Sequence, residues 1–247
     1  MQRLIMTSTT YRQSSTVSPE LEKLDPDNIL LSRMPMRRMT AEELCDTLLL
    51  ASGRLDETRF GPPQPVEVRE DGLVTPIETD KGWRRSLYVE QRRSRIPTML
   101  DSFDLPAMSP HCLQREVATV ATQALHLMNN GWVDRLAGHF AERVWKEAGN
   151  DPREQIDQAF WITLSRSPSE EEKRVSLEAF NRFAAETARP AASKGTQPAA
   201  SRAKEGPAHQ DNPQIGYSES ERSGVVPPAL QNFCHALVNS AAFLYID

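Results

Sequence analysis

The chain has 247 residues, of which 38% are hydrophobic and 26% are charged, and its formal net charge is −5. This acidic balance argues against a protein that binds nucleic acid or a membrane surface over most of its face, because such proteins carry an excess of Lys and Arg. No apolar run is long enough to span a bilayer, and the first residues, MQRLIMTSTTYRQSS, lack the apolar core of a signal peptide.

The three cysteines are too few and too scattered for a disulfide framework. Cys45 and Cys234 lie in apolar helical patterns, where a thiol usually behaves as a small buried hydrophobe. The sequence contains neither C-x-x-C nor C-x-x-C-H, so we expect no cysteine-bound zinc and no attached haem. We therefore predict no metal and no cofactor.

The first half of the chain predicts short helices with a small β element. Thr40 and Glu43 form an S/T-x-x-E capping box at the start of an apolar helical stripe. Residues 66–77, VEVREDGLVTPI, alternate around an Asp-Gly pair, which is typical of a β-hairpin. The alternation in 84–93, RRSLYVEQRR, predicts a further strand, and 97–103 predicts a short helical turn.

The second half predicts a series of helices. A helix is expected over 116–129, and the next carries apolar residues in steps of four from Trp132 to Val144. Asp151-Pro152 and Ser167-Pro168 each place an N-cap residue before a proline in the first turn, which predicts an antiparallel pair of helices.

The tract 187–226 is rich in Ala, Ser, Pro, Gly and charged residues and poor in large apolar ones, so we expect it to be disordered. Pro227-Pro228 then opens a last helix, whose broad apolar face is supplied by Leu230, Phe233, Cys234, Leu237, Phe243 and Leu244. We expect that face to pack against the helices of 115–185, since it would otherwise be exposed to water.

These patterns predict a mainly α fold, a helical bundle with a small two- or three-stranded β element and a long disordered insertion. Residues 1–186 and 227–247 are expected to form one mainly helical domain, incomplete at its N-terminus, with 187–226 as a linker or insertion. Leu4, Ile5 and Thr9 sit at helical spacing almost from Met1 without a capping residue, which is why the start looks incomplete.

Several segments in order resemble one family. They are RLIMTSTTYRQSS, RRSLYVEQRRS, MLDSFDLP, a C-x-x-R-E motif followed by TQALHLMN, LSRSPSEEEKR, and NFCHALVNSAAFLYID. This order resembles the C-terminal domain of large planctomycete secreted proteins, a domain of unknown function of the PSD type that is often associated with a cytochrome-c-like module. The resemblance covers nearly the whole chain apart from the polar tract. It implies a periplasmic or extracellular location, other domains of the same or a neighbouring exported protein as partners, and a truncated N-terminus.

Two carboxylates and their neighbours form the first candidate site. Asp101 and Asp104 stand one helical turn apart, and Arg115 and Glu116 follow nearby in the sequence. Paired carboxylates can hydrolyse glycosidic bonds or bind metal ions. The alternative is an ion-pair network in which the acids only hold arginines.

An arginine cluster is the second candidate site. Arg84, Arg85, Arg92 and Arg93 lie in a stretch, 81–95, whose only acidic residue is Glu90. Guanidinium forks suit carboxylate, sulfate and phosphate groups, so an anionic glycan or an acidic protein surface is a candidate ligand. Nucleic acid is not expected, because a single tyrosine is available for stacking. The alternative is that some of these arginines pair with Asp101, Asp104 and Glu116 and brace the β element against a helix.

A thiol and three histidines complete the candidates. A catalytic Cys112 would need a base within reach, but His111 is adjacent in sequence and such side chains rarely face each other, so we interpret Cys112 as a packed loop thiol. His126 and His139 are not at the i, i+4 spacing of a metal pair, and His126 is expected in the core or at a helix end.

We therefore predict an uncharacterised scaffold or interaction domain of a larger exported multidomain protein. One alternative is a hydrolase that acts on complex or anionic polysaccharide through the Asp101, Asp104, Arg115 and Glu116 region. The second alternative is an accessory domain of an electron-transfer protein, which only the resemblance implies.

Overall fold

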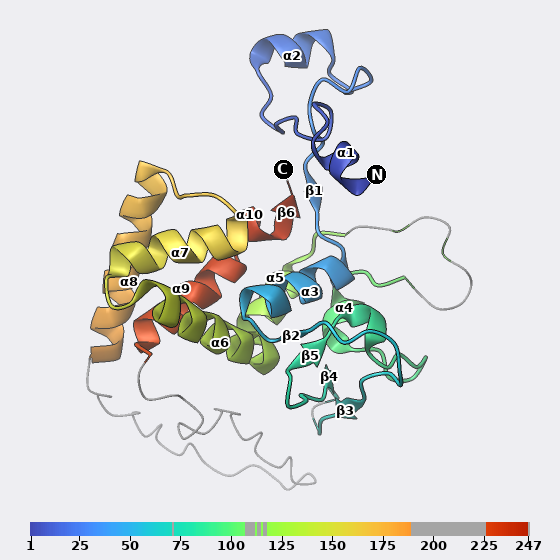
Figure 1. The fold of residues 1–247 in the computed structure, drawn as a ribbon, viewed down its shortest axis with the longest axis vertical. Helices are drawn as coiled ribbons and strands as arrows, with labels where there is room; N and C mark the ends of the chain where they lie inside the picture. Colours follow the sequence, from blue (N-terminus) through green and yellow to red (C-terminus); the bar gives the residue numbers. More distant parts are fainter. Residues whose placement is uncertain (71, 107–111, 113–114, 116–117, 189–225, 247) are drawn as a thin grey trace, which may run out of the picture. The chain divides into compact units, whose positions relative to one another are not determined.

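The structure, a computed structural model, describes residues 1–70, 72–106, 112, 115, 118–188 and 226–246 (Figure 1). About 52% of the described residues are helical, in ten α-helices, with a few short strands. The mainly α prediction is therefore confirmed. Except for its first two residues and its last, the predicted disordered insertion 187–226 lies outside the described residues.

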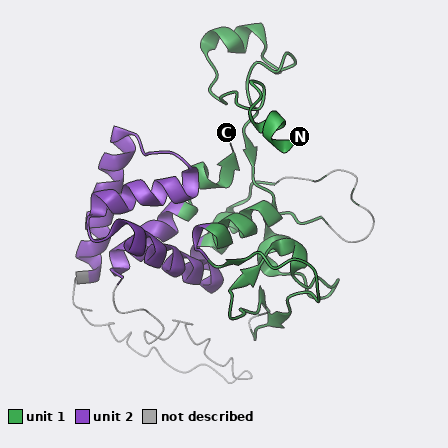
Figure 2. Ribbon diagram, in the orientation of Figure 1, with its two compact units in different colours: residues 1–50, 54–127, 238–247 green, residues 51–53, 128–237 purple. Residues whose placement is uncertain are grey.

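The chain divides into two compact units (Figure 2). Unit 1 comprises Met1–Leu50, Arg54–Leu127 and Val238–Asp247, and unit 2 comprises Ala51–Gly53 and Met128–Leu237. Each unit is thus built from segments that are distant in sequence. The grouping of 1–186 with 227–247 as a single domain stays a prediction.

Unit 2 is a set of helices that begin at local caps: α6 (Gly131–Ala148), α7 (Pro152–Leu164), α8 (Glu170–Ala188) and α9 (Pro228–Val238). The side chain of Asn130 accepts a hydrogen bond from the Trp132 N–H at 2.8 Å and starts α6. The residues that step by four along this helix, Trp132, Leu136, Phe140 and Val144, are all buried, as predicted.

Helices α7 and α8 pack against each other after a short connection. Asp151 caps α7 by accepting from the Arg153 N–H at 3.0 Å. The cap of α8 is Ser169 rather than Ser167, a correction to the sequence prediction. Ser169 Oγ accepts from the Glu172 N–H at 3.3 Å, and Glu172 Oε2 accepts from the Ser169 N–H at 2.7 Å. Arg166 also binds Glu172, which favours this register.

The last long helix, α9, packs within unit 2 as predicted. The rings of Phe233 and Phe180 lie 6.2 Å apart, and the Gln231 side chain donates to Asp134 Oδ1 at 3.2 Å. The predicted continuation of this helix to Leu244 is wrong. Ser240 caps a separate short helix, α10 (Ala241–Leu244), which leads into strand β6 (Tyr245–Ile246).

The strands of unit 1 form three separate pairs rather than one sheet. β1 (Arg37–Arg38) pairs antiparallel with β6, β2 (Leu55–Asp56) pairs parallel with β5 (Trp83–Arg84), and β3 (Val66–Val68) pairs antiparallel with β4 (Val74–Pro76). The predicted hairpin over 66–77 is the β3–β4 pair. The predicted strand over 84–93 is wrong beyond Arg84.

Residues after Arg84 turn into a 3₁₀ helix, η1 (Ser86–Tyr88). The Ser86 N–H donates to Asp46 Oδ1 at 2.7 Å, and Asp46 lies on helix α3 (Ala41–Ala51). Because this backbone donor is used by a helix side chain, the chain bends away from a strand here.

The β2–β5 pair depends on a close approach of backbone at Gly82. Its φ is +103°, and a Cβ atom at this position would lie 2.2 Å from the Arg54 carbonyl oxygen. The same oxygen accepts from the Trp83 N–H at 2.9 Å. The indole N–H of the buried Trp83 donates to the Pro76 carbonyl at 3.0 Å and ties β5 to β4.

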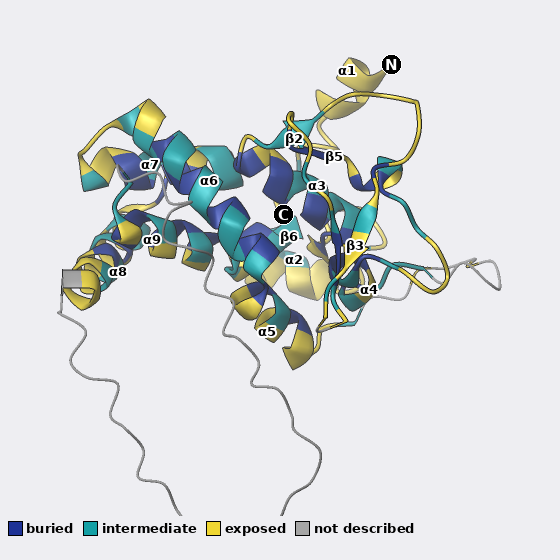
Figure 3. Ribbon diagram, turned by 90° about the horizontal axis from the view of Figure 1, so that it is seen from below, coloured by how far each residue is buried: buried dark blue, intermediate teal, exposed yellow. Residues whose placement is uncertain are grey.

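Helix α4 (Thr98–Ser102) confirms the predicted helical turn, whereas α5 (Ala121–Asn129) begins later than the predicted residue 116. The Ala118 N–H donates to Asp104 Oδ2, so the backbone before α5 is held in a non-helical conformation. The first helices, α1 (Gln2–Met6) and α2 (Pro19–Leu24), contain no buried residue, and α1 is exposed throughout (Figure 3). Among the described helices, none is long and apolar enough to cross a membrane.

Candidate functional site

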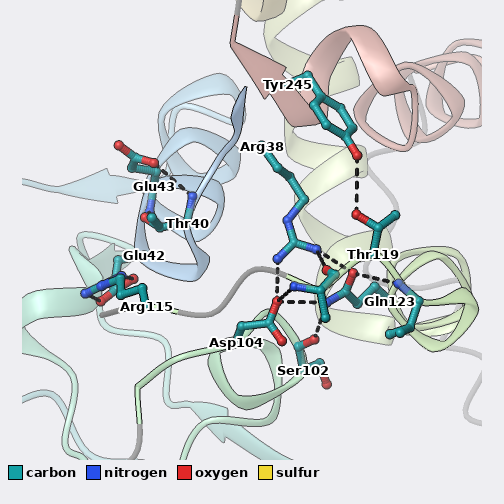
Figure 4. A network of polar contacts seen from close by, with 12 residues as sticks. Arg38, Thr40, Glu42, Glu43, Ser102, Asp104, Arg115, Thr119, Gln123 and Tyr245 are labelled. Carbon is teal, nitrogen blue, oxygen red and sulfur yellow. Dashed lines mark hydrogen bonds and ion pairs between the residues drawn. The ribbon is translucent and has the colours of Figure 1, made fainter. Parts of the chain in front are cut away.

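Arg38 is a buried charged residue of unit 1 that joins three segments of the chain (Figure 4). Its side chain is 5% exposed. Nη2 donates to Asp104 Oδ2 at 2.6 Å, and Nη1 donates to Gln123 Oε1 at 2.6 Å and to the Ala118 carbonyl. The guanidinium also lies over the ring of Phe103, 5.7 Å from its centroid.

Asp104 is the acceptor at the centre of this network. Its backbone has a φ of +65°, and Oδ2 accepts from the Ala118 N–H at 2.9 Å as well as from Arg38. Burial acts to raise the pKa of Asp104, but these two hydrogen bonds outweigh it, so the pKa lies below its ordinary value. Asp104 is therefore an ionised structural acceptor near neutral pH. Asp101, by contrast, is exposed on α4.

Arg115 binds Glu42 of α3 rather than either of the two predicted aspartates. Its Nη1 and Nη2 atoms donate to the two carboxylate oxygens, each at 2.7 Å. The hydrogen bond from Arg115 lowers the pKa of Glu42, although burial acts in the opposite direction. Glu116, the fourth residue of the predicted acidic site, lies outside the described residues.

A pocket of about 850 Å³ lies in unit 1. Its charged lining residues are Glu42 and Asp46 of α3 and Arg85, Glu90 and Arg92 of the segment after β5. The remaining lining residues are Pro63, Ser86, Leu87, Val89, Gln91 and Leu105. The pocket thus collects two arginines of the cluster, the helix carboxylates and several apolar side chains in one place.

Two of the four predicted anion-binding arginines line this pocket, and each is bound to a carboxylate. Arg85 Nε donates to Asp46 Oδ2 at 2.8 Å, and the two side chains are 58% and 16% exposed. Arg92 Nε pairs with Glu90, and these side chains are 66% and 22% exposed. In both pairs the arginine is the more accessible partner.

The other two arginines of the cluster have different positions. Arg84 is buried, donates to the carbonyls of Thr58, Phe60 and Pro62, and lies over the ring of Tyr88 at 4.4 Å. It therefore fixes the proline-rich loop before β3. Arg93 is exposed and does not line the pocket. The expected pairing of this cluster with Asp104 is wrong, because Arg38 occupies that carboxylate.

The cysteines and histidines do not assemble a second site in the described part of the chain. Cys45 and Cys234 are buried as predicted, and burial raises the pKa of both thiols. Cys112 is exposed, so the interpretation as a packed loop thiol is wrong, and His111 lies outside the described residues. Burial lowers the pKa of His126 on α5. No group of three His, Cys, Asp or Glu residues within the described ranges is placed to hold a metal ion.

Residues 1–180 match the family of proteins of unknown function designated PSD1 (DUF1553). The chain belongs to this family. No curated protein and no solved structure matches the chain. The match confirms the resemblance seen in the sequence and identifies an uncharacterised domain, and within it the structure places the Arg38 network and the pocket.

Sequence reasoning missed several residues that build these features, chiefly Arg38, Gln123, Glu42 and Asp46. A signal for two of them was present, because Glu42 and Asp46 are four residues apart on the predicted helix after Thr40 and therefore share a face. Arg38 and Gln123 carried no local signal, since their partners are 66 and 85 residues away along the chain.

Proposed function

We propose that this PSD1 chain is a scaffold and interaction domain of a larger exported planctomycete multidomain protein, with other domains of the same or a neighbouring protein as its partners. The observation that carries the proposal is that two carboxylates of unit 1, Asp104 and Glu42, are bound by arginines. Asp104 is bound by Arg38, and Glu42 is bound on both oxygens by Arg115. Carboxylates held in this way stabilise the arrangement of distant segments.

A hydrolytic function is supported less well by the same geometry. Glycoside hydrolysis needs one carboxyl group that stays protonated near neutral pH, which requires a raised pKa. The pKa values of both Asp104 and Glu42 are lowered. An accessory role in electron transfer rests only on the cytochrome-like neighbours that the family resemblance implies.

Asp104→Asn tests the scaffold proposal. Asn keeps the shape of the side chain but removes the counter-charge of the buried Arg38, so we expect the free energy of unfolding in urea to fall by about 2–3 kcal/mol. Asp101→Asn is the matched control, because Asp101 is exposed on α4. It should change the free energy of unfolding by less than about 0.5 kcal/mol.

A hydrolysis assay on acidic and neutral polysaccharides accompanies the stability measurement. If both variants keep the stability of the parent protein and lose a hydrolytic activity that the parent shows, the two aspartates are a catalytic pair and the scaffold proposal fails.

A further inference from the structure

The pocket contains two ion pairs, and in each of them the carboxylate is less exposed to solvent than the arginine. Asp46 and Glu90 are the less exposed partners, and each holds the Nε atom of a more exposed arginine, Arg85 or Arg92. In the part of the chain that the structure describes, the terminal Nη1 and Nη2 groups of these two arginines donate no hydrogen bond to a protein group. Four N–H-bearing nitrogens are therefore available to a ligand at one pocket.

An arginine bound in this way is suited to an oxyanion. The two terminal amino groups of a guanidinium form a planar fork that matches the paired oxygens of a carboxylate or sulfate. The carboxylate on Nε restricts the side chain before a ligand arrives, which lowers the entropy lost on binding. The Ser86 N–H, which donates to the second oxygen of Asp46, restricts that carboxylate in turn.

The charges around the pocket argue against a ligand that is bound only by electrostatic attraction to the arginines. Glu42, Asp46 and Glu90 balance Arg85, Arg92 and the Glu42-bound Arg115, so these six groups sum to no net charge. A ligand must therefore satisfy hydrogen-bond acceptors as well as donors. Hydroxyl groups can donate to Glu42 and Glu90 and can pair with the amide of Gln91.

The volume of the pocket and its apolar lining residues further restrict the chemical class of the ligand. A volume of about 850 Å³ is in the range of sites for organic ligands and far exceeds that of an inorganic anion. Pro63, Leu87, Val89 and Leu105 offer apolar contact to C–H groups. A molecule with oxyanion groups, several hydroxyl groups and C–H faces is an acidic saccharide.

We propose that the pocket of unit 1 binds an acidic saccharide, with Arg85 and Arg92 as forks for its carboxylate or sulfate groups. This inference rests on the proposed function and specifies what the interaction domain recognises. Arg84 and Arg93, which the sequence placed in the same cluster, have no part in it, because one is buried on backbone carbonyls and the other lies outside the pocket lining.

Titration calorimetry on the full chain with three probes tests the proposal. Trigalacturonate carries carboxylates, a sulfated maltotriose carries sulfates, and maltotriose is the uncharged reference. We expect one or both charged probes to bind and maltotriose to bind at least tenfold more weakly. The tighter of the two charged probes identifies the group that the forks prefer. Binding should weaken between 20 and 200 mM NaCl, because the arginines are solvent-exposed.

Variants distinguish hydrogen bonding by the two guanidinium groups from a general effect of positive charge on the surface. Arg85→Gln and Arg92→Gln should each weaken binding about tenfold, since each removes a charge-assisted hydrogen-bonding fork. Arg85→Lys keeps the charge but not the fork and should also weaken binding several-fold. Arg93→Gln removes the same charge from an exposed neighbour outside the pocket and should change affinity less than twofold. Unchanged thermal unfolding of each variant shows that the fold is kept.

The proposal is overturned if no probe binds, if maltotriose binds as tightly as the charged probes, or if Arg93→Gln weakens binding as much as the pocket variants. If Arg85→Lys binds the charged probe as tightly as the parent protein does, the paired hydrogen bonds proposed for the Arg85 guanidinium are refuted. None of these outcomes bears on the loss of stability expected in Asp104→Asn, so the failure of the ligand assignment is distinguishable from the failure of the scaffold proposal.

Discussion

Unit 1 and unit 2 are stabilised over different sequence distances. In unit 2, caps at Asn130, Asp151 and Ser169 start helices within three residues of themselves, and buried apolar faces bring the helices together. In unit 1, Arg38 reaches Asp104 and Gln123, and β1 pairs with β6 at the other end of the chain. The first kind of contact can be recognised from local sequence, and the second cannot.

Both units nevertheless use one identical device. Arg37, Thr40 and Glu43 in unit 1 have the same R-x-x-[ST]-x-x-E spacing as Arg166, Ser169 and Glu172 in unit 2. In each, the Ser or Thr and the Glu cap the helix reciprocally, while the Arg donates two hydrogen bonds to the two oxygens of the same Glu. The units therefore differ in how their elements are joined and not in how a helix is started.

The largest expected effect is on the apolar joining of unit 2. Phe140→Ala removes a buried ring from α6 and leaves a cavity, so the free energy of unfolding should fall by about 4 kcal/mol in urea denaturation. Val175→Ala, on α8 where Val175 is 50% exposed, is the control and should cost less than about 1 kcal/mol. Equal losses of unfolding free energy in the two variants would mean that the buried Phe140 of α6 stabilises the unit no more than an exposed side chain does.

Arg38→Gln breaks the polar joining of unit 1. It leaves Asp104 without its ion-pair partner and removes donors from Gln123 and the Ala118 carbonyl, so we expect a loss of about 3 kcal/mol in the same measurement. The adjacent Arg37→Gln is the matched control. Arg37 is 47% exposed and binds a Glu43 that is 41% exposed, so its loss should stay below about 1 kcal/mol. A similar loss in both variants would remove the distinction drawn for Arg38.

The elements that the sequence predicted correctly are determined by interactions between residues that are close together in the chain. The helix after Thr40, the hairpin over 66–77 and the helix carrying Phe140 all follow from caps, turn residues and periodicity within a few residues. Those signals are strong because the interacting groups are covalently close. The prediction of these elements therefore required no knowledge of the tertiary structure.

Errors arose where a distant partner changes a local preference. The alternation in 84–93 favours a strand, but Asp46 takes the Ser86 N–H and the chain forms η1 instead. The sequence indicated only Arg85 and Arg92 of the pocket, because two of its carboxylates, Glu42 and Asp46, come from α3, about 40 residues earlier. Arg38 resembles its exposed neighbour Arg37 in sequence, and only the fold shows that one is buried and the other is not.

The smallest expected effect tests the device that the units share. The hydrogen bond from the arginine is the main cause that lowers the pKa of Glu43 and of Glu172 to about 2, from an ordinary value of 4.5. A carboxyl group whose pKa is lower in the folded state stabilises the fold above its unfolded pKa, and that contribution is lost as the pH falls toward 2. Glu43→Gln and Glu172→Gln keep the capping acceptor but lose the ion pair. Because the four side chains are 35% to 48% exposed, each variant should lose only about 0.5 kcal/mol at pH 7.

The difference between parent and variant should shrink as urea denaturation is repeated from pH 7 down to pH 2.5, and it should shrink equally in the two units. Arg37→Gln should reproduce the pH profile of Glu43→Gln, because both remove the same pair. A difference that stays constant with pH would show that the glutamates act only as caps. Unequal profiles would show that the surroundings of the device, and not its spacing alone, determine how much the ion pair contributes.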